Sequence, residues 1–216
     1  MLESIKGQFD AVRLYWNGTD KPDVPKWVTV INEDGDLTDL GKFRFLTGAI
    51  GFNKWPDEYY FTLDDDLIYP PTYADDMVAA IKEHGCIVTH HGRRLLGKGK
   101  QYYGGHDLTM CLKANPTDRS VDVAGTGVTA FSTDYFRPLI WRDTRMKMAD
   151  LVFSEEAARR GKEIMCLAHP SDYFGYLEPE NTIHETEQHN QDRLIAVANR
   201  IYQLKQDAAR SLNPIQ

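Results

Sequence analysis

Apolar residues fall into short runs along the chain, and the runs near its start are typical of strands. Residues 10–17 (DAVRLYWN) are rich in β-branched and aromatic side chains and end at the turn signal NGTDKPD, and residues 27–31 (WVTVI) form a second such run. Residues 42–52 (KFRFLTGAIGF) instead space their apolar positions roughly as a helix does, with Asp39 available as an N-cap. We therefore expect two strands followed by a helix.

The next pattern predicts a strand, a helix and another strand. Residues 58–63 (EYYFTL) are almost wholly apolar, as expected of a central strand covered on both faces. Residues 72–85 (TYADDMVAAIKEHG) combine a Thr cap, an acidic first turn and a Gly stop, which predicts a helix, and residues 86–92 (CIVTHHG) return as a strand. This order indicates a right-handed parallel unit.

The remaining chain continues the alternation after one irregular segment. Residues 93–115 are rich in Gly, Lys, His and Tyr without a period, which favours a mobile loop near a site, although a solvated face or a partner site is equally consistent. Further strands are expected at RSVDVA, VTAFS and EIMCLA, and helices at about 146–160 and 187–209.

These elements predict an α/β protein with a single mixed, mostly parallel sheet flanked by helices, Rossmann-like in character. No repeat interrupts the chain, so residues 1–186 are expected to form one domain. Residues 187–216 are expected to form a C-terminal helical arm that packs on this domain or on a partner, which would allow a homo-oligomer through that helix.

Composition narrows the class of protein. The chain has 216 residues and a net charge of -7 spread along its length, so nucleic acid is not expected as a partner. The cysteines, Cys86, Cys111 and Cys166, lie far apart in apolar surroundings, as buried thiols in a reducing compartment do. No transmembrane segment and no signal sequence are expected, so the predicted location is cytoplasmic.

Three successive aspartates, Asp64, Asp65 and Asp66, follow the strand at 58–63. Like charges at this density repel one another unless a cation or hydrogen-bond donors offset them, and hard carboxylate oxygens favour Mg²⁺ or Mn²⁺. In open α/β sheets ligands bind at the carboxyl ends of the strands, and alternate positions share a face, so Asp64 and Asp66 would reach one metal while Asp65 points elsewhere. The alternatives are a helix cap before the next helix and a phosphatase-type aspartate nucleophile, which the two prolines that follow disfavour.

The segment FTLDDDLIYPPTYADDMV resembles the DxD region of A-type fold (GT-A) glycosyltransferases, specifically small bacterial sugar transferases for capsule or surface polysaccharide. The motifs GDLTDLGKF upstream and VDVAGTGVTAF and CLAHP downstream occur in the family's order. The resemblance implies transfer of a sugar from a nucleotide-sugar donor, with a UDP-sugar favoured, to a hydroxyl acceptor, with Mn²⁺ or Mg²⁺ as cofactor.

The resemblance also implies roles for individual residues. Asp64, Asp66 and the histidine of CLAHP, His169, would bind the metal, although a histidine before proline is also typical of a satisfied core or turn position. Asp150 would take the proton of the acceptor hydroxyl, and Asp65 is a second candidate catalytic carboxylate; the alternative for Asp150 is a helix-surface acid.

The donor-binding residues implied by the resemblance come from two motifs and the acidic cluster: Asp39, Lys42, Asp64, Gly125, Thr126 and Gly127. Lys42 would offset the diphosphate charge, and glycines let a backbone approach a ligand closely. The alternatives are an N-cap for Asp39, a solvated first-turn lysine for Lys42, and a turn that uses glycine for geometry alone.

The family pattern places a strand and most of a helix before the stretch matched here by LESIKGQFDAVRLYWN. An incomplete or rebuilt base pocket is therefore expected. A second hypothesis follows: a truncated, inactive relative that binds a nucleotide sugar or a protein partner without turnover. A nucleotidyltransferase is a third, but a Gly-rich phosphate loop near the N-terminus is lacking.

Overall fold

The structure is a computed structural model that describes residues 1–20, 22–32, 35–46, 59–145, 147–177 and 191–212. The helices are η1 (Leu2–Ile5) and η2 (Thr38–Leu46), both 3-10, and α1 (Tyr73–His84), α2 (Ala149–Arg159) and α4 (Gln191–Leu212). The strands are β1 (Val12–Tyr15), β2 (Val28–Ile31), β3 (Tyr59–Leu63), β4 (Leu67–Ile68), β5 (Ile87–Thr89), β6 (Gly92–Arg94), β7 (Asp107–Thr109), β8 (Arg119–Ser120), β9 (Val123–Ala124), β10 (Val128–Ser132), β11 (Ile164–Cys166) and β12 (Gly175–Tyr176).

The prediction of a single, mostly parallel sheet is wrong. The largest sheet has the strand order β3-β10-β5-β11-β8, and only β5 and β11 pair in parallel. Three smaller sheets stand beside it: parallel β1-β2, antiparallel β12-β4 and antiparallel β7-β6-β9. The prediction failed because β10 inserts between β3 and β5 and runs opposite to both, and local sequence pattern does not report this long-range pairing.

Strand direction nevertheless gathers several strand ends at one edge of the central sheet. Because β3 and β5 are each antiparallel to β10, they run in the same direction, and β11 is parallel to β5. The carboxyl ends of β3, β5 and β11 therefore share an edge with the start of β10. Among the described strands β3 is first in the sheet order, so the expectation of a central position for it is also wrong.

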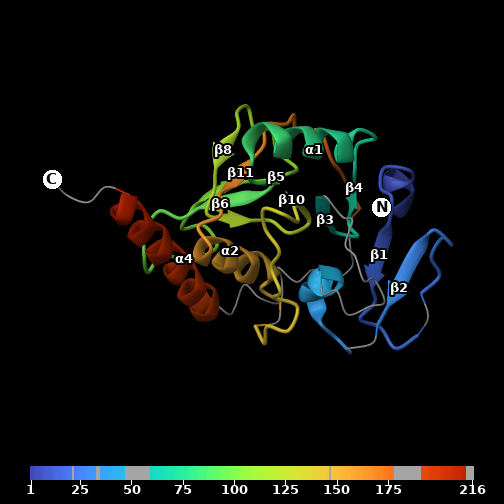
Figure 1. Cartoon of the computed structure of the whole chain (residues 1–216), viewed down its shortest axis with the longest axis horizontal. Coiled ribbons are helices and arrows are strands. Elements are labelled where there is room, and N and C mark those ends of the chain that lie inside the picture. The colour runs from blue at the N-terminus through green and yellow to red at the C-terminus, as the bar shows by residue number, and fades with distance from the viewer. Residues whose placement is uncertain (21, 33–34, 47–58, 146, 178–190, 213–216) are drawn as a thin grey trace.

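Helices cover both faces of the central sheet (Figure 1). Helix α1 lies over one face and packs on β5 and β10 through Met77 and Ile81, both buried. The helix ends as predicted at Gly85, which adopts φ +62° and donates its amide to the Ile81 carbonyl. Thr72 does not cap the backbone; its hydroxyl donates to the Asp76 carboxylate.

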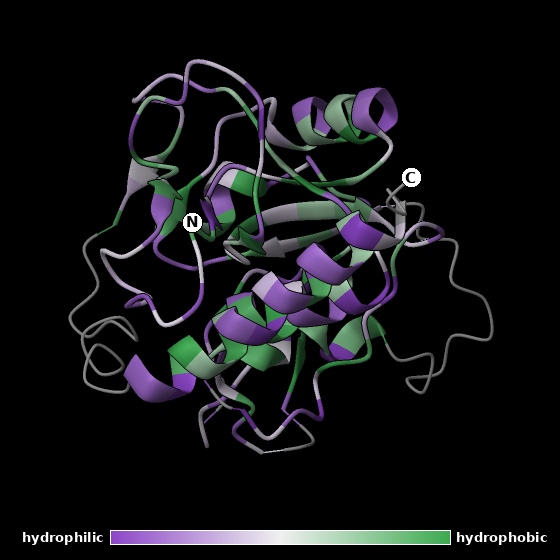
Figure 2. Ribbon diagram, turned by 90° about the vertical axis from the view of Figure 1, so that its left-hand side faces the viewer, coloured by the Kyte–Doolittle hydropathy of each residue, from purple (hydrophilic) through white to green (hydrophobic). Residues whose placement is uncertain are grey.

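Helices α2 and α4 cover the opposite face and pack against each other (Figure 1). The buried side chains of α4 recur every three or four positions, at Leu194, Val197, Ala198 and Ile201. Figure 2 shows α4 in the foreground with mostly hydrophilic residues. The predicted apolar stripe is thus buried against α2. Within the described ranges, no helix is both long and apolar enough to cross a membrane.

A buried carboxylate also joins these two helices. Glu155 of α2 is 1% exposed and accepts hydrogen bonds from Arg200 of α4 and Arg159 of α2, each at 2.9 Å, and from Arg145. Burial alone would raise the pKa of Glu155, but the arginines lower it to about 2. The ion cluster therefore fixes how α4 sits on α2.

Three further predictions can be compared with the structure. The segment 93–115, expected to be an irregular loop, contains β6 and β7 and lies against α4, where the Gly99 amide donates to Asn199 Oδ1 at 2.9 Å. The helix expected at 42–52 is in part the 3-10 helix η2, and residues 47–58 lie outside the described residues. The division at residue 186 falls in a segment that is likewise outside them.

Truncating the α2–α4 contact should destabilise the fold. Ile201 is 0% exposed, so Ile201→Ala is expected to lower the free energy of unfolding by about 2–4 kcal/mol through lost burial and a residual cavity. Urea denaturation followed by circular dichroism measures this change. Gln206→Ala, at an exposed position of the same helix, is the control and should change the unfolding free energy by less than about 0.5 kcal/mol.

Candidate functional site

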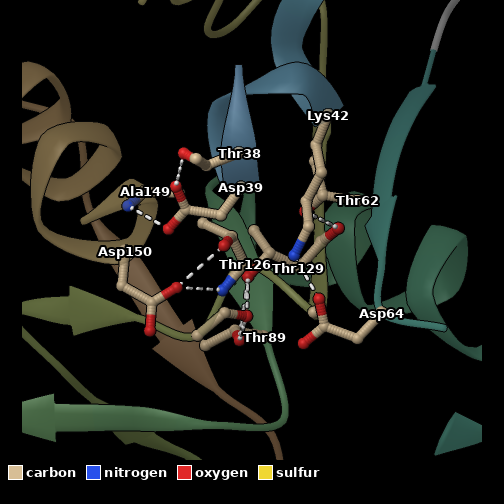
Figure 3. A network of polar contacts seen from close by, with 12 residues as sticks. Thr38, Asp39, Lys42, Thr62, Asp64, Thr89, Thr126, Thr129, Ala149 and Asp150 are labelled. Atoms are coloured by element: carbon tan, nitrogen blue, oxygen red, sulfur yellow. Dashed lines mark hydrogen bonds and ion pairs between the residues drawn. The ribbon is translucent and has the colours of Figure 1, made fainter. Parts of the chain in front are cut away.

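The candidate site lies at the shared edge of the central sheet (Figure 3). Asp64 follows β3, His90 follows β5, and the turn Gly125-Thr126-Gly127 leads into β10. Helix η2 adds Asp39 and Lys42 from one side, and the first turn of α2 adds Asp150. The fold thus brings together the donor-binding residues and Asp150, which the sequence spreads over more than a hundred positions.

Asp64 and Lys42 form the ion pair at the centre of the site. The Lys42 ammonium donates to Asp64 Oδ1. The Asp64 amide donates to the Gly127 carbonyl at 3.3 Å, so the carboxylate lies directly over this turn. A Cβ on Gly127 would stand 1.8 Å from Asp64 Oδ2, so only glycine fits there.

Three carboxyl groups act on the single Lys42 ammonium. Burial alone would lower the pKa of Lys42, but the nearby Asp64, then Asp150 and Asp39, raise it above its ordinary value. Lys42 is therefore charged at neutral pH. The alternative of a solvated first-turn lysine does not fit this environment, because the side chain of Lys42 is only 21% exposed.

Asp39 fastens η2 to the start of α2. Its Oδ2 accepts the Ala149 amide at 2.8 Å, and its Oδ1 accepts the Thr38 hydroxyl at 3.1 Å. Ala149 is the first residue of α2, so Asp39 satisfies an amide at the amino end of a helix other than its own. Burial raises the pKa of Asp39.

Asp150 is held by the glycine-flanked turn. Its Oδ1 accepts both the Thr126 amide, at 2.7 Å, and the Thr126 hydroxyl, at 2.8 Å (Figure 3). Among the described residues, Asp150 Oδ2 accepts no hydrogen bond. One carboxylate oxygen is thus fixed, and the other remains for a ligand.

The other two aspartates of the cluster differ in burial. Asp65 is exposed and Asp66 is half-buried. Burial, followed by repulsion from Asp64 and Asp65, raises the pKa of Asp66. The Asp66 carbonyl accepts the Leu177 amide at 2.7 Å, which fixes the backbone behind this side chain.

His169 lies in a different environment from the acidic cluster. Its backbone pairs with Asn115 through hydrogen bonds of 2.9 and 2.8 Å, and its ring packs 5.1 Å from the His90 ring. Nδ1 and Nε2 face the carbonyl oxygens of Leu167, at 2.9 Å, and Met110, at 3.4 Å. Both ring nitrogens therefore face backbone oxygens, as in the alternative of a satisfied core histidine. Within the described ranges, no three His, Cys, Asp or Glu side chains form a group that could hold a metal.

A cleft of about 990 Å³ opens beside the ion pair. Four of the predicted residues line it: Asp39, Lys42, Asp64 and Asp65. The remaining wall includes residues of η1, β1, β3 and α1, together with Thr38 and Lys147. Thr38 and Lys147 both have positive φ, +49° and +60°, and the Lys147 amide donates to the Thr38 hydroxyl at 3.2 Å. Strained residues in contact at the mouth of a cleft are common at functional sites.

Sequence reasoning missed three residues of this edge, Tyr69, His90 and His91. The Tyr69 hydroxyl donates to the Gly127 carbonyl at 2.7 Å and accepts the Asp64 amide at 2.8 Å, tying the strand end to the turn. His91 lies against Gly125, and burial, then Arg93, lowers its pKa to about 4. The signal was present, because His90 and His91 end a predicted strand at the ligand-binding edge.

No model of a known protein family matches the chain, and no curated protein sequence matches it. The resemblance to glycosyltransferases therefore rests on the four motifs alone. Function is accordingly inferred from the residues that the fold assembles and from their chemistry.

Acid should destabilise the protein through His90. This side chain is 2% exposed among the rings of Tyr173, Phe174 and His169, and burial, then His169, lowers its pKa to about 3. The unfolded state takes up a proton near pH 6.5 and the folded state only near pH 3, so the stabilisation is complete above pH 6.5 and is lost as pH falls through this window.

The expected loss is up to about 1.4 kcal/mol per pH unit from this one group. Urea unfolding at pH 4, 5, 6 and 7 measures the slope, and His90→Leu should reduce it. Gln206→Ala, which changes an exposed, non-titrating position of α4, is the control and should leave the slope unchanged. An unchanged slope in His90→Leu would contradict the assignment.

Proposed function

We propose that this protein is a metal-dependent glycosyltransferase that moves a sugar from a nucleotide-diphosphate donor, a UDP-sugar in the first instance, to a hydroxyl acceptor. The observation that carries the proposal is the ion pair of Lys42 with Asp64 at the sheet edge, beside a large cleft and within the electrostatic influence of Asp39 and Asp150. The order and identity of the four motifs support the same chemistry.

The charge balance of the site favours a divalent cation. Three carboxyl groups act on one ammonium, and Asp65 and Asp66 add further negative charge. A diphosphate entering this cleft would be repelled unless a cation accompanied it. Burial and then its acidic neighbours raise the pKa of Asp66, so a cation beside this carboxyl group would stabilise its charged form.

The donor atoms at this edge fit Mg²⁺ or Mn²⁺. Asp66 and Asp64 supply hard carboxylate oxygens, and such ions are commonly held by one or two carboxylates plus substrate phosphates and waters. His169 does not fit in this arrangement, since its nitrogens face the Leu167 and Met110 carbonyls. When bound, the ion would act as a Lewis acid on the leaving diphosphate.

The chain's own residues would then act on donor and acceptor. Lys42 would be a fixed cation that offsets charge on the phosphates, and Gly127 leaves room for the Asp64 carboxylate beside that ammonium. Asp150 would accept the proton of the acceptor hydroxyl at Oδ2, with its rotamer fixed by Thr126. The hydroxyl oxygen forms a bond to the anomeric carbon as the bond to the diphosphate oxygen breaks.

The cellular location and the partners of the protein are also proposals. The three cysteines are free and buried, which supports a reducing, cytoplasmic location. The net charge of -7 continues to disfavour nucleic acid as a partner. A homo-oligomer through α4 would have to use its outer face, because the apolar stripe is buried against α2.

Removing Asp66 should abolish metal-linked nucleotide binding. Calorimetric titration with UDP should show Mn²⁺-dependent binding to the parent protein, and Asp66→Ala should weaken it by about tenfold or more, since a direct carboxylate ligand to the metal is lost. Asp134→Ala, at an exposed position after β10, is the matched control. Metal-independent binding that survives in Asp66→Ala would refute the proposed site.

Removing the proposed base should separate chemistry from binding. Asp150→Asn is expected to lower the rate of UDP-sugar hydrolysis about 10²–10⁴-fold, with the UDP dissociation constant unchanged. Thr126→Val keeps one of the two hydrogen bonds to Asp150 and should fall between parent and Asp150→Asn. Nucleotide binding by the parent without any donor hydrolysis would instead favour the inactive relative.

A further inference from the structure

The turn Gly125-Thr126-Gly127 has a side chain against each of its glycines. A Cβ on Gly127 would collide with the Asp64 carboxylate, and a Cβ on Gly125 would stand 2.8 Å from the Cβ of His91 and 2.9 Å from its Cγ and Cδ2. Neither glycine has φ in the left-handed region, so backbone conformation does not call for glycine at either position. Glycine is required because Asp64 and His91 occupy the space that a side chain would fill.

The middle residue of the turn holds a third side chain. Thr126 fixes Oδ1 of Asp150 through its amide and its hydroxyl, and Asp64 and Asp150 lie on either side of Thr126 (Figure 3). The backbone of His91 is joined to the same turn, because its carbonyl accepts the Gly125 amide at 2.7 Å. One short turn therefore fixes Asp64, Asp150 and His91 relative to one another.

The His91 imidazole is neutral and accessible. Burial, then the Arg93 guanidinium, lowers its pKa to about 4, against the opposing influence of Asp150 and Asp64, so at neutral pH the ring has one N–H donor and one acceptor nitrogen. Within the described ranges neither ring nitrogen makes a hydrogen bond, and neither is enclosed by the protein. The side chain is half-buried, so both nitrogens lie in a recess that remains open to a ligand.

The proposed roles of Asp64 and Asp150 define what passes beside this ring, and this step rests on the proposed function. The described residues that line the donor cleft include Asp64 and Lys42 but neither Asp150 nor His91. The anomeric carbon is bonded to the diphosphate before transfer and to the acceptor oxygen afterwards. The sugar must therefore extend out of the cleft from Asp64 toward Asp150, across the turn against which His91 packs.

We propose that His91 is a specificity-determining residue, whose imidazole forms a hydrogen bond with one hydroxyl group of the transferred sugar. A neutral ring with one donor and one acceptor matches a hydroxyl group, which also has both. A site built to bind a hydroxyl rejects an analogue that lacks it, because a polar group of the protein is then left unpaired. His91 thus contributes to the choice of sugar, whereas Asp66 and Asp150 serve the metal and the proton.

Hydrolysis kinetics test the contact, with UDP as a matched ligand that lacks the sugar. The donor is whichever of UDP-glucose, UDP-galactose and UDP-N-acetylglucosamine the parent protein hydrolyses fastest with Mn²⁺. His91→Phe keeps an aromatic ring but loses both nitrogens, and should lower kcat/KM about three- to tenfold, the effect of one hydrogen bond. The UDP dissociation constant should not change. His91→Gln, which retains a donor and an acceptor, should recover part of the loss.

Singly deoxygenated derivatives of the same donor separate a sugar contact from a packing role. If His91 binds one hydroxyl, the derivative that lacks this hydroxyl should be hydrolysed equally well by the parent and by His91→Phe. Derivatives that lack another hydroxyl should keep the full difference between the two proteins. The same difference with every derivative would assign His91 to packing of the turn and would overturn the proposal.

The remaining outcomes distinguish this proposal from the proposed function. A parent that neither binds UDP with Mn²⁺ nor hydrolyses a donor would refute sugar transfer and the role of His91 together. An active parent whose kcat/KM is unchanged in His91→Phe, at equal thermal stability, would refute the role of His91 alone. Equal losses of UDP binding and of hydrolysis in His91→Phe would also refute it, since the variant would then have disturbed the whole site.

Discussion

The arrangement of the site depends on one electrostatic constraint, the excess of carboxyl groups around Lys42. Asp64 reaches this ammonium only because Gly127 leaves room for it, and Asp39 and Asp150 come from elements that are fixed by other contacts. A partly buried cation loses stabilisation when an acidic neighbour moves away from it. The fold must therefore hold η2, β3, the turn before β10 and α2 in register at once.

Helix α2 connects the site to the rest of the molecule. Its first residues are tied to η2 by Asp39 and to the turn by Thr126, and its middle is tied to α4 by Glu155 and its arginines. The contacts of Asp39 and Thr126 belong to the site, whereas those of Glu155 hold α4 on α2. The position of Asp150 is thus fixed by contacts at the start and in the middle of the same helix.

The sequence predicted most of the elements but not the sheet, and several of the candidate residues that it singled out lie at one sheet edge. The strand at EYYFTL, the helix that ends at Gly85 and the buried strand in EIMCLA are all confirmed, because each is specified by local pattern. The insertion of β10 between β3 and β5 was missed, because pairing of distant strands leaves no local signal. The aspartates do follow a strand, as predicted. This was enough to identify the edge of the sheet, because the carboxyl ends of strands that run in the same direction lie at the same edge. His169 shows the limit of this reasoning: it follows a strand at that edge, yet its ring turns toward backbone carbonyls.

The antiparallel position of β10 also sets the order in which the protein can assemble. Thr129 contacts Thr62 across 67 positions and Thr89 across 40, so neither neighbouring strand finds its partner until residues 128–132 have been synthesised. Contacts this distant close slowly, because the chain between them loses conformational freedom first. During synthesis β3 therefore emerges before β10, and the edge that β10 will cover stays exposed to aggregation over this interval.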